Sequence, residues 1–170
     1  MKKRPETNEY NPYYLTYINL VGEGDIVDIL SQQIKETVEQ LKGLTEEQAH
    51  FRYAPDKWTI KEVIGHIADT ERIMSYRLLS FARGEKMTLP GFNEADYVHY
   101  AAFNHLAIEE LLENLKAVRY STIHLLNGLE EEAWLRRGNA NGSDATVRAI
   151  AYIIAGHELH HRNIIQQRYL

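Results

Sequence analysis

The chain has 170 residues and a formal net charge of -5, and it contains no cysteine. The length fits one domain, residues 1–170, and the missing thiols exclude thiolate chemistry, disulfides and cysteine-based zinc sites. The acidic balance disfavours a nucleic-acid backbone or an anionic membrane surface, so we expect no nucleic acid and no membrane as partner.

Residues 1–22 are expected to form an N-terminal extension ahead of the first helix. The stretch from Met1 to Thr7 has no apolar core behind it, so it is not a secretory signal. No apolar run approaches membrane-spanning length. The default expectation is a cytoplasmic protein.

Two amphipathic helices are predicted in the first half of the chain. Apolar residues recur at helical spacing over 26–41, and Asp25 is a suitable N-cap. A second apolar stripe covers 60–81. Thr59 and Glu62 precede it in the T-x-x-E spacing of a capping box, which predicts that this helix begins at residue 60.

Two further helices are predicted in the second half. The third stripe covers 108–129, and the fourth begins near Asp144 or Thr146 and continues almost to residue 170. Strand signals are absent, because no segment alternates between apolar and polar residues. The Asn141-Gly142 pair lies in a polar stretch between two helices and is interpreted as a loop.

Four amphipathic helices of this kind indicate an all-α fold, a four-helix bundle. The connection over 85–103 is too long for a tight antiparallel hairpin. It predicts a crossover that carries the chain back along the bundle, with a short helix from Asn93, so that the second and third helices run parallel.

Histidines interrupt the apolar stripe of the last helix. The stripe is Ile150, Ile154, His157, His161 and Ile164. His157 and His161 therefore stand one turn apart on a face that should be buried. Neutral imidazoles there need partners, and an i, i+4 pair can chelate one divalent metal ion such as zinc, nickel or iron.

The same segment, His157-Glu158-Leu159-His160-His161, is a literal H-E-x-x-H string, which in zincin proteases places a glutamate base beside the metal. A zincin needs a third ligand downstream, and here Ile164 and Gln167 occupy the positions of the extended motif. We therefore interpret Glu158 as incidental. His160 points about 60° away from His157 and is expected at the bundle edge or behind a ligand.

A third ligand must come from another helix. The other histidines are His50, His66, His99, His105 and His124. His50 lies in a loop and His99 in the crossover. His66 is best placed because it borders the core face of the second helix, while His105 and His124 flank the third helix and remain alternatives.

Glu71 stands on the core stripe of the second helix, where an unpaired carboxylate is costly. It is the candidate catalytic residue. The alternatives are that it holds a ligand imidazole, contacts water at a metal, or pairs with an arginine across the bundle. Asp69 is interpreted as solvated, with orientation of the His66 ring as the alternative.

Three segments carry a family resemblance. They are Leu44-Thr45-Glu46-Glu47-Gln48, the stretch from Pro55 to Glu71, and His157-Glu158-Leu159-His160-His161-Arg162. In this order and spacing they resemble the DinB-like superfamily of small four-helix bundles, which includes the YfiT group, over about residues 25–170. The family often continues the histidine pair with Arg-Gly-Gln, whereas Asn163 and Ile164 follow Arg162 here.

The resemblance implies a divalent metal held by His66, His157 and His161. It also implies a metal-dependent hydrolase or thiol S-transferase and a homodimer. The resemblance further implies a small-molecule substrate. In the transferase case, a low-molecular-weight thiol would supply the thiol group that this cysteine-free chain lacks. The alternative is a non-catalytic metal-binding or sensor bundle, since a fold does not fix a function.

Overall fold

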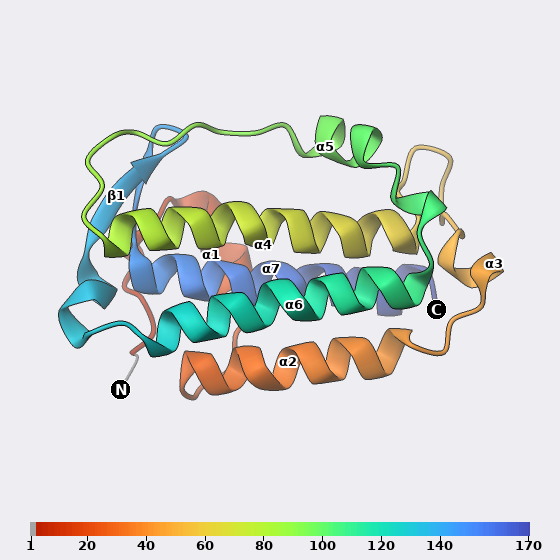
Figure 1. Cartoon of the computed structure of the whole chain (residues 1–170), viewed down its shortest axis with the longest axis horizontal. Coiled ribbons are helices and arrows are strands. Elements are labelled where there is room, and N and C mark those ends of the chain that lie inside the picture. The colour runs from red at the N-terminus through yellow and green to blue at the C-terminus, as the bar shows by residue number, and fades with distance from the viewer. Residues whose placement is uncertain (1–2) are drawn as a thin grey trace.

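Four long helices lie side by side in the computed structural model, which describes residues 3–170 (Figure 1). They are α2 (Ile26–Leu41), α4 (Ile60–Ala82), α6 (Ile108–Asn127) and α7 (Val147–Arg168), and they confirm the four predicted helices. α4 packs against α6 and α7, and α2 packs against the same two helices, which closes a four-helix bundle. The shorter elements are α1 (Leu15–Ile18), α3 (Glu46–Ala49), α5 (Glu94–Ala101), β1 (Arg137–Ala140), β2 (Ser143–Thr146) and the 3-10 turns Thr7–Glu9, Pro12–Tyr14, Phe103–His105 and Glu131–Leu135.

Short polar side chains begin the long helices where the sequence predicts. Asp25 accepts a hydrogen bond from the second N–H of α2 at 2.9 Å. Thr59 and Glu62 form the predicted capping box: the N–H of Glu62 donates to Thr59 Oγ1 at 3.1 Å, and the N–H of Thr59 donates to Glu62 Oε2 at 2.8 Å. Thr146 caps α7 by accepting from the N–H of Ala149 at 3.1 Å. These contacts satisfy N–H groups that have no partner inside the helix.

The segment between α4 and α6 runs back along the bundle, so α4 and α6 point the same way (Figure 1). Asn93 caps α5 within this segment by accepting the N–H of Ala95 at 3.0 Å. Phe103 anchors the end of the crossover against α4, where Gly65 makes room: a Cβ at Gly65 would lie 2.5 Å from the ring. The predicted crossover and the short helix after Asn93 are confirmed.

The prediction that the chain contains no strand is wrong. β1 and β2 form an antiparallel hairpin whose turn is Asn141 and Gly142, both at positive φ, the conformation that suits a two-residue hairpin. Leu89 of the crossover pairs with the same hairpin: its N–H donates to Asn139 O, and its carbonyl accepts from the N–H of Asn141, both at 2.9 Å. This contact and the turn hold strands whose own residues lack β-branched apolar runs.

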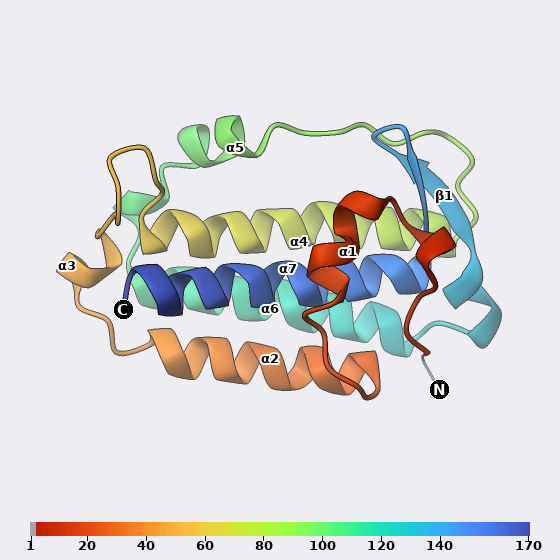
Figure 2. The same ribbon diagram turned by 180° about the vertical axis from the view of Figure 1, so that it is seen from behind.

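The N-terminal segment lies across α7 rather than apart from the bundle (Figure 2). Gly156 permits this approach, because a Cβ there would lie 2.1 Å from the carbonyl oxygen of Tyr17. Glu9 fastens the segment further along: it is buried and accepts hydrogen bonds from Thr146 at 2.7 Å and from the guanidinium of Arg148. The predicted extension therefore covers the helix that carries two of the candidate ligands.

Buried apolar side chains form two clusters, one toward each end of the bundle. Buried polar side chains from all four long helices lie between them, and we call this layer the polar belt. Its members are Gln33, Thr37, His66, Thr70, Glu71, Arg119, Thr122, His157 and Glu158. Burying polar groups is costly unless they are paired. The belt, where polar side chains replace apolar ones in the core, is therefore the place to look for a functional site.

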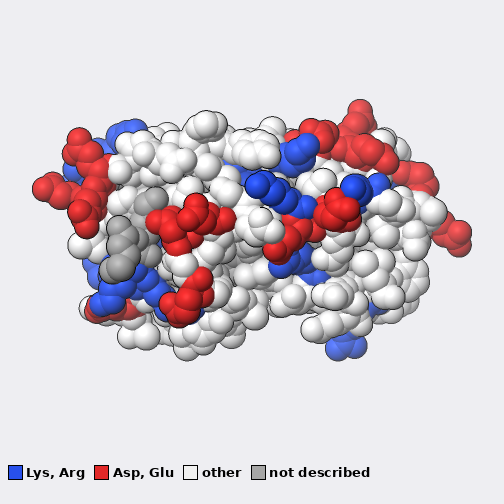
Figure 3. All heavy atoms as spheres, turned by 90° about the horizontal axis from the view of Figure 1, so that it is seen from below, with Lys and Arg blue, Asp and Glu red and all other residues white. Residues whose placement is uncertain are grey.

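Basic and acidic side chains lie next to one another over the centre and left of the face seen in Figure 3, and acidic side chains gather along its upper right edge. One ion pair, between half-buried Arg162 and exposed Glu36, joins α7 to α2 at 2.9 Å. Within residues 3–170, none of the helices has both the length and the apolar character that crossing a bilayer demands.

Candidate metal centre

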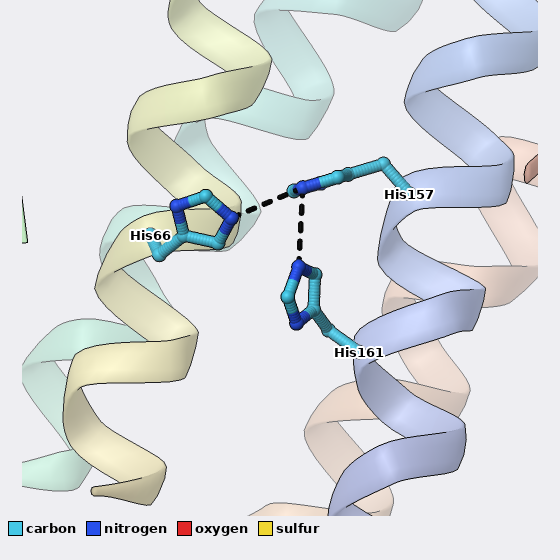
Figure 4. A group of neighbouring side chains, drawn as sticks. All are labelled: His66, His157 and His161. Atoms are coloured by element: carbon cyan, nitrogen blue, oxygen red, sulfur yellow. Dashed lines mark hydrogen bonds between the residues drawn. The ribbon is translucent and has the colours of Figure 1, made fainter. Parts of the chain in front are cut away.

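Three histidine side chains from α4 and α7 converge in the polar belt (Figure 4). His157 Nε2 lies 3.1 Å from His66 Nε2 and 3.2 Å from His161 Nε2. Each ring offers one nitrogen, and all three nitrogens lie within 4.8 Å of one another. The structure therefore brings together the three residues predicted as ligands.

Burial keeps these imidazoles neutral. His66 and His157 are buried, and His161 is half-buried. Desolvation lowers the pKa of His66 to about 4 and the pKa of His157 to about 3, with smaller contributions from the neighbouring imidazoles. The pKa of His161 is lowered well below its ordinary value for the same reasons. At neutral pH each ring therefore has a lone pair available to a cation.

The arrangement suits a metal ion better than a set of hydrogen bonds. An imidazole nitrogen has either one N–H or one lone pair in the ring plane, so His157 Nε2 forms a good hydrogen bond with one neighbour only. Zinc–nitrogen bonds in a tetrahedral site place ligand nitrogens roughly 3.3 Å apart. The observed separations of 3.1 and 3.2 Å are close to that value. The three residues fit a divalent cation.

Neighbours on α4 and the preceding loop hold the His66 ring. Thr70 Oγ1 lies 3.4 Å from His66 Nδ1 and is placed to accept its N–H, which leaves Nε2 facing the other histidines. The ring of Trp58 packs beside the imidazole at a centroid distance of 4.8 Å. Asp69 pairs with Arg72 at 3.1 Å and not with this ring; it is half-buried and burial raises its pKa, so it is less solvated than predicted.

Glu71 pairs with an arginine across the bundle, one of the alternatives predicted for it. Arg119 Nε lies 2.9 Å from Glu71 Oε1, and Arg119 Nη2 lies 2.8 Å from Glu71 Oε2. Arg119 is fully buried, and it also donates to the carbonyl of Leu30 at 3.1 Å. Both Glu71 oxygens are thus engaged by a cation, which favours a structural role over proton transfer.

Glu158 corrects the interpretation that the glutamate of the H-E-x-x-H string is incidental. It is fully buried, lies 2.6 Å from Arg119 Nη2, and accepts from Thr37 Oγ1 at 2.5 Å. Burial lowers the pKa of Arg119, but Glu158 and Glu71 raise it by more, so the guanidinium stays charged between two carboxylates. Arg119 of α6 thereby links α4 to α7 through its ion pairs with Glu71 and Glu158.

Sequence reasoning missed Arg119. It stands four residues after Leu115 on the buried face of α6, where a charged residue is unusual, and that anomaly was the available signal. Within residues 3–170 the nitrogen cluster contains none of the other candidates, His50, His99, His105 or His124. His160 lies at the edge of the site, where its ring contacts those of Tyr17 and His161 at 5.2 and 5.1 Å.

A pocket of about 290 Å³ reaches the site at His157 and Thr70. It runs along the seam between α4 and α7, and the N-terminal segment, the crossover and the hairpin form its other walls. Tyr17 borders it, and its ring meets the His157 ring edge-on at 5.6 Å. One of the three candidate ligands, His157, therefore lines a space that a small molecule can enter.

Comparisons with known proteins identify the family and the fold. A model of the DinB superfamily matches residues 29–165. A protein of Oceanobacillus iheyensis, named as a candidate metal-dependent hydrolase, is 26% identical over 137 residues, which are 79% of this chain and 76% of that protein.

Two solved structures share the fold. YfiT from Bacillus subtilis, described as a probable metal-dependent hydrolase with an unusual four-helix bundle topology, superposes with a TM-score of 0.72 at 17% identity, covering 97% of this chain and 90% of YfiT. A mycothiol-dependent maleylpyruvate isomerase superposes with a TM-score of 0.68 at 12% identity, covering 86% of this chain and 61% of the isomerase.

Proposed function

The chain belongs to the DinB superfamily, and from that premise we propose that it is a metal-dependent hydrolase of a small molecule, with the metal held by His66, His157 and His161. One observation carries the proposal: three neutral imidazole nitrogens converge, and one of the three residues, His157, lines a pocket that opens to solvent. Structural zinc sites are normally closed by a fourth protein ligand, whereas catalytic sites keep three ligands and an open position.

A divalent ion held there supplies a Lewis acid, which polarises a carbonyl or acidifies a water or a thiol. The protein residues orient the ligands, keep them neutral and shield them from water. Thr70 fixes the His66 ring, and burial keeps all three imidazoles unprotonated. Tyr17 and the rest of the N-terminal segment shield His157 from bulk water on one side. Glu71 and Glu158 face Arg119, so we assign them the positioning of α4 and α7.

Thiol S-transfer is the second candidate. The solved neighbour that depends on mycothiol shares the fold, which supports a thiol cosubstrate for the same kind of site. This chain has no cysteine, so the sulfur must come from a low-molecular-weight thiol. The pocket beside His157 provides the entrance that such a thiol needs.

Metal-loaded protein tests both candidates in one panel of esters, amides and thiol–electrophile pairs. We expect turnover in at least one class, its loss in His157→Ala, and its retention in His124→Ala, which changes an exposed histidine outside the cluster. The absence of turnover with every substrate of the panel, at full metal occupancy, would contradict catalysis and favour a non-catalytic metal-binding or sensor protein.

A further inference from the structure

The pocket beside His157 contains a cation that the proposed chemistry leaves unused. Arg77, on α4, lines the pocket together with Thr70 and Met74 of the same helix. Its side chain is buried, with 5% of the residue exposed. We call the space the Arg77 pocket.

The partners of Arg77 are all uncharged. Its Nη2 donates to the carbonyl of Pro90 at 2.9 Å, its Nη1 lies 3.7 Å from Met74 Sδ, and it contacts Tyr14, whose pKa burial raises and Arg77 partly lowers. A guanidinium has five N–H donors, more than these partners use. Within residues 3–170 no carboxylate lies within ion-pair distance of Arg77.

The contrast with Arg119 shows that this is unusual for the molecule. Arg119 is also buried, but two carboxylates surround it. A buried charge without a counter-ion is costly, so a fold retains one where a ligand supplies the missing charge. Glu94 lines the same pocket but lies at its exposed rim and forms no ion pair with Arg77. The guanidinium is available to an anion that enters the pocket.

Helix geometry sets the distance between this cation and the candidate metal site. Arg77 follows His66 by eleven positions on α4, which corresponds to about 16 Å along the axis. The arginine side chain reaches back to Met74, which shortens the gap to about 12 Å. Thr70 and Met74 line the space between them.

We propose that the Arg77 pocket binds an oxyanion group of the substrate, a carboxylate or a phosphate, while the reacting part of the same molecule faces His157. The substrate is then an elongated anion whose charged end lies on the order of 10 Å from its reacting bond. The planar guanidinium suits such a group because it presents paired N–H donors. The substrate role rests on the proposed function, whereas anion binding at Arg77 does not.

The test separates these two statements by measuring binding without metal. Titration calorimetry of the full chain, stripped of metal, uses hexanoate and octanoate in one arm and hexyl phosphate in the other. We expect at least one arm to bind, and Arg77→Met to weaken that binding by at least 10-fold, as loss of a charge-assisted hydrogen bond predicts. Arg77→Lys keeps the charge and should retain part of the affinity.

Arg72→Met is the matched control, because Arg72 is on the same helix, is paired with Asp69 and lies outside the Arg77 pocket. It should bind the probes as the unmodified chain does. Arg77→Met should fold at least as stably as the unmodified chain, because it removes an unpaired buried charge. The anion site is refuted if neither probe binds the unmodified chain, or if Arg77→Met and Arg72→Met bind alike.

Metal-loaded protein tests the substrate role. For any substrate class that turns over, Arg77→Met should lower kcat/KM for the anionic member at least 10-fold and leave a neutral ester or amide of equal length unchanged. Equal losses for both would contradict a substrate role. Anion binding in the metal-free chain with no turnover would leave the anion site in place and refute the hydrolase proposal instead.

Discussion

Replacing Arg119 with methionine perturbs the polar belt at the point where its charges meet. The guanidinium is fully buried and makes contacts of 2.8 to 3.2 Å with Glu71, together with a contact of 2.6 Å with Glu158. Removing one partner of a buried ion pair costs about 3–5 kcal/mol, because the remaining charge has no compensation. Here two carboxylates lose their cation, so we expect Arg119→Met to lower the free energy of unfolding by at least about 4 kcal/mol.

Urea unfolding followed by circular dichroism measures this loss directly. The matched variant combines Arg119→Met with Glu71→Leu and Glu158→Gln, which removes all three charges and keeps an acceptor for Thr37. We expect it to recover most of the lost free energy, since replacing a buried ion group with uncharged residues is often close to neutral. A loss below about 1 kcal/mol in the single variant, or a triple variant less stable than the single one, would refute the charge balance described for the belt.

Three further predictions concern the surroundings of the site. Gly156→Ala should lower the unfolding free energy by about 1–3 kcal/mol, measured by urea unfolding, because its Cβ meets the carbonyl of Tyr17; an unchanged value would contradict that contact. Burial raises the pKa of Glu9, but its hydrogen bonds lower it further, to about 2. The ionised Glu9 side chain therefore contributes about 2–3 kcal/mol to the free energy of unfolding above pH 4.5, and this contribution is lost as the pH falls from 4.5 to 2. Glu9→Gln should therefore flatten the fall in stability over that pH range, and an unchanged slope would count against the pairing. Thr70→Val should weaken metal binding about 10-fold in a chelator competition, because the His66 ring loses its hydrogen-bond acceptor. Equal metal affinity in the variant and the unmodified chain would show that this contact does not affect metal binding.

The helices could be predicted because their signals are local. Asp25 and Thr59 act as caps in the structure as the sequence pattern predicts, the short helix begins after Asn93, and apolar spacing identifies the buried faces. The hairpin could not be predicted in this way, because its strands depend on a partner far away in the chain, Leu89. Its turn, Asn141-Gly142, is typical of a hairpin, but the residues on either side form no apolar strands that would predict one.

In the candidate site too, the local features could be predicted from the sequence and the tertiary features could not. The spacing of His157 and His161 places both on one face of a helix, so the sequence alone predicts a pair. The position of His66 beside the core face of its helix favours it as the third ligand. Excluding His105 and His124 needs the family resemblance, because which helices face each other is a tertiary property. Glu158 was misjudged for that reason too: its burial depends on Arg119, which approaches from another helix.

The metal content of the purified chain tests the central claim most directly. Elemental analysis after loading with zinc, nickel or iron, followed by removal of unbound ions, should give about one divalent ion per chain, since one cluster of three nitrogens was found within residues 3–170. His157→Ala and His161→Ala should lose the metal, His66→Ala should lose most of it, and His124→Ala should keep it. Full retention in His66→Ala together with loss in His124→Ala, or no bound metal in the unmodified chain, would contradict the three-histidine site.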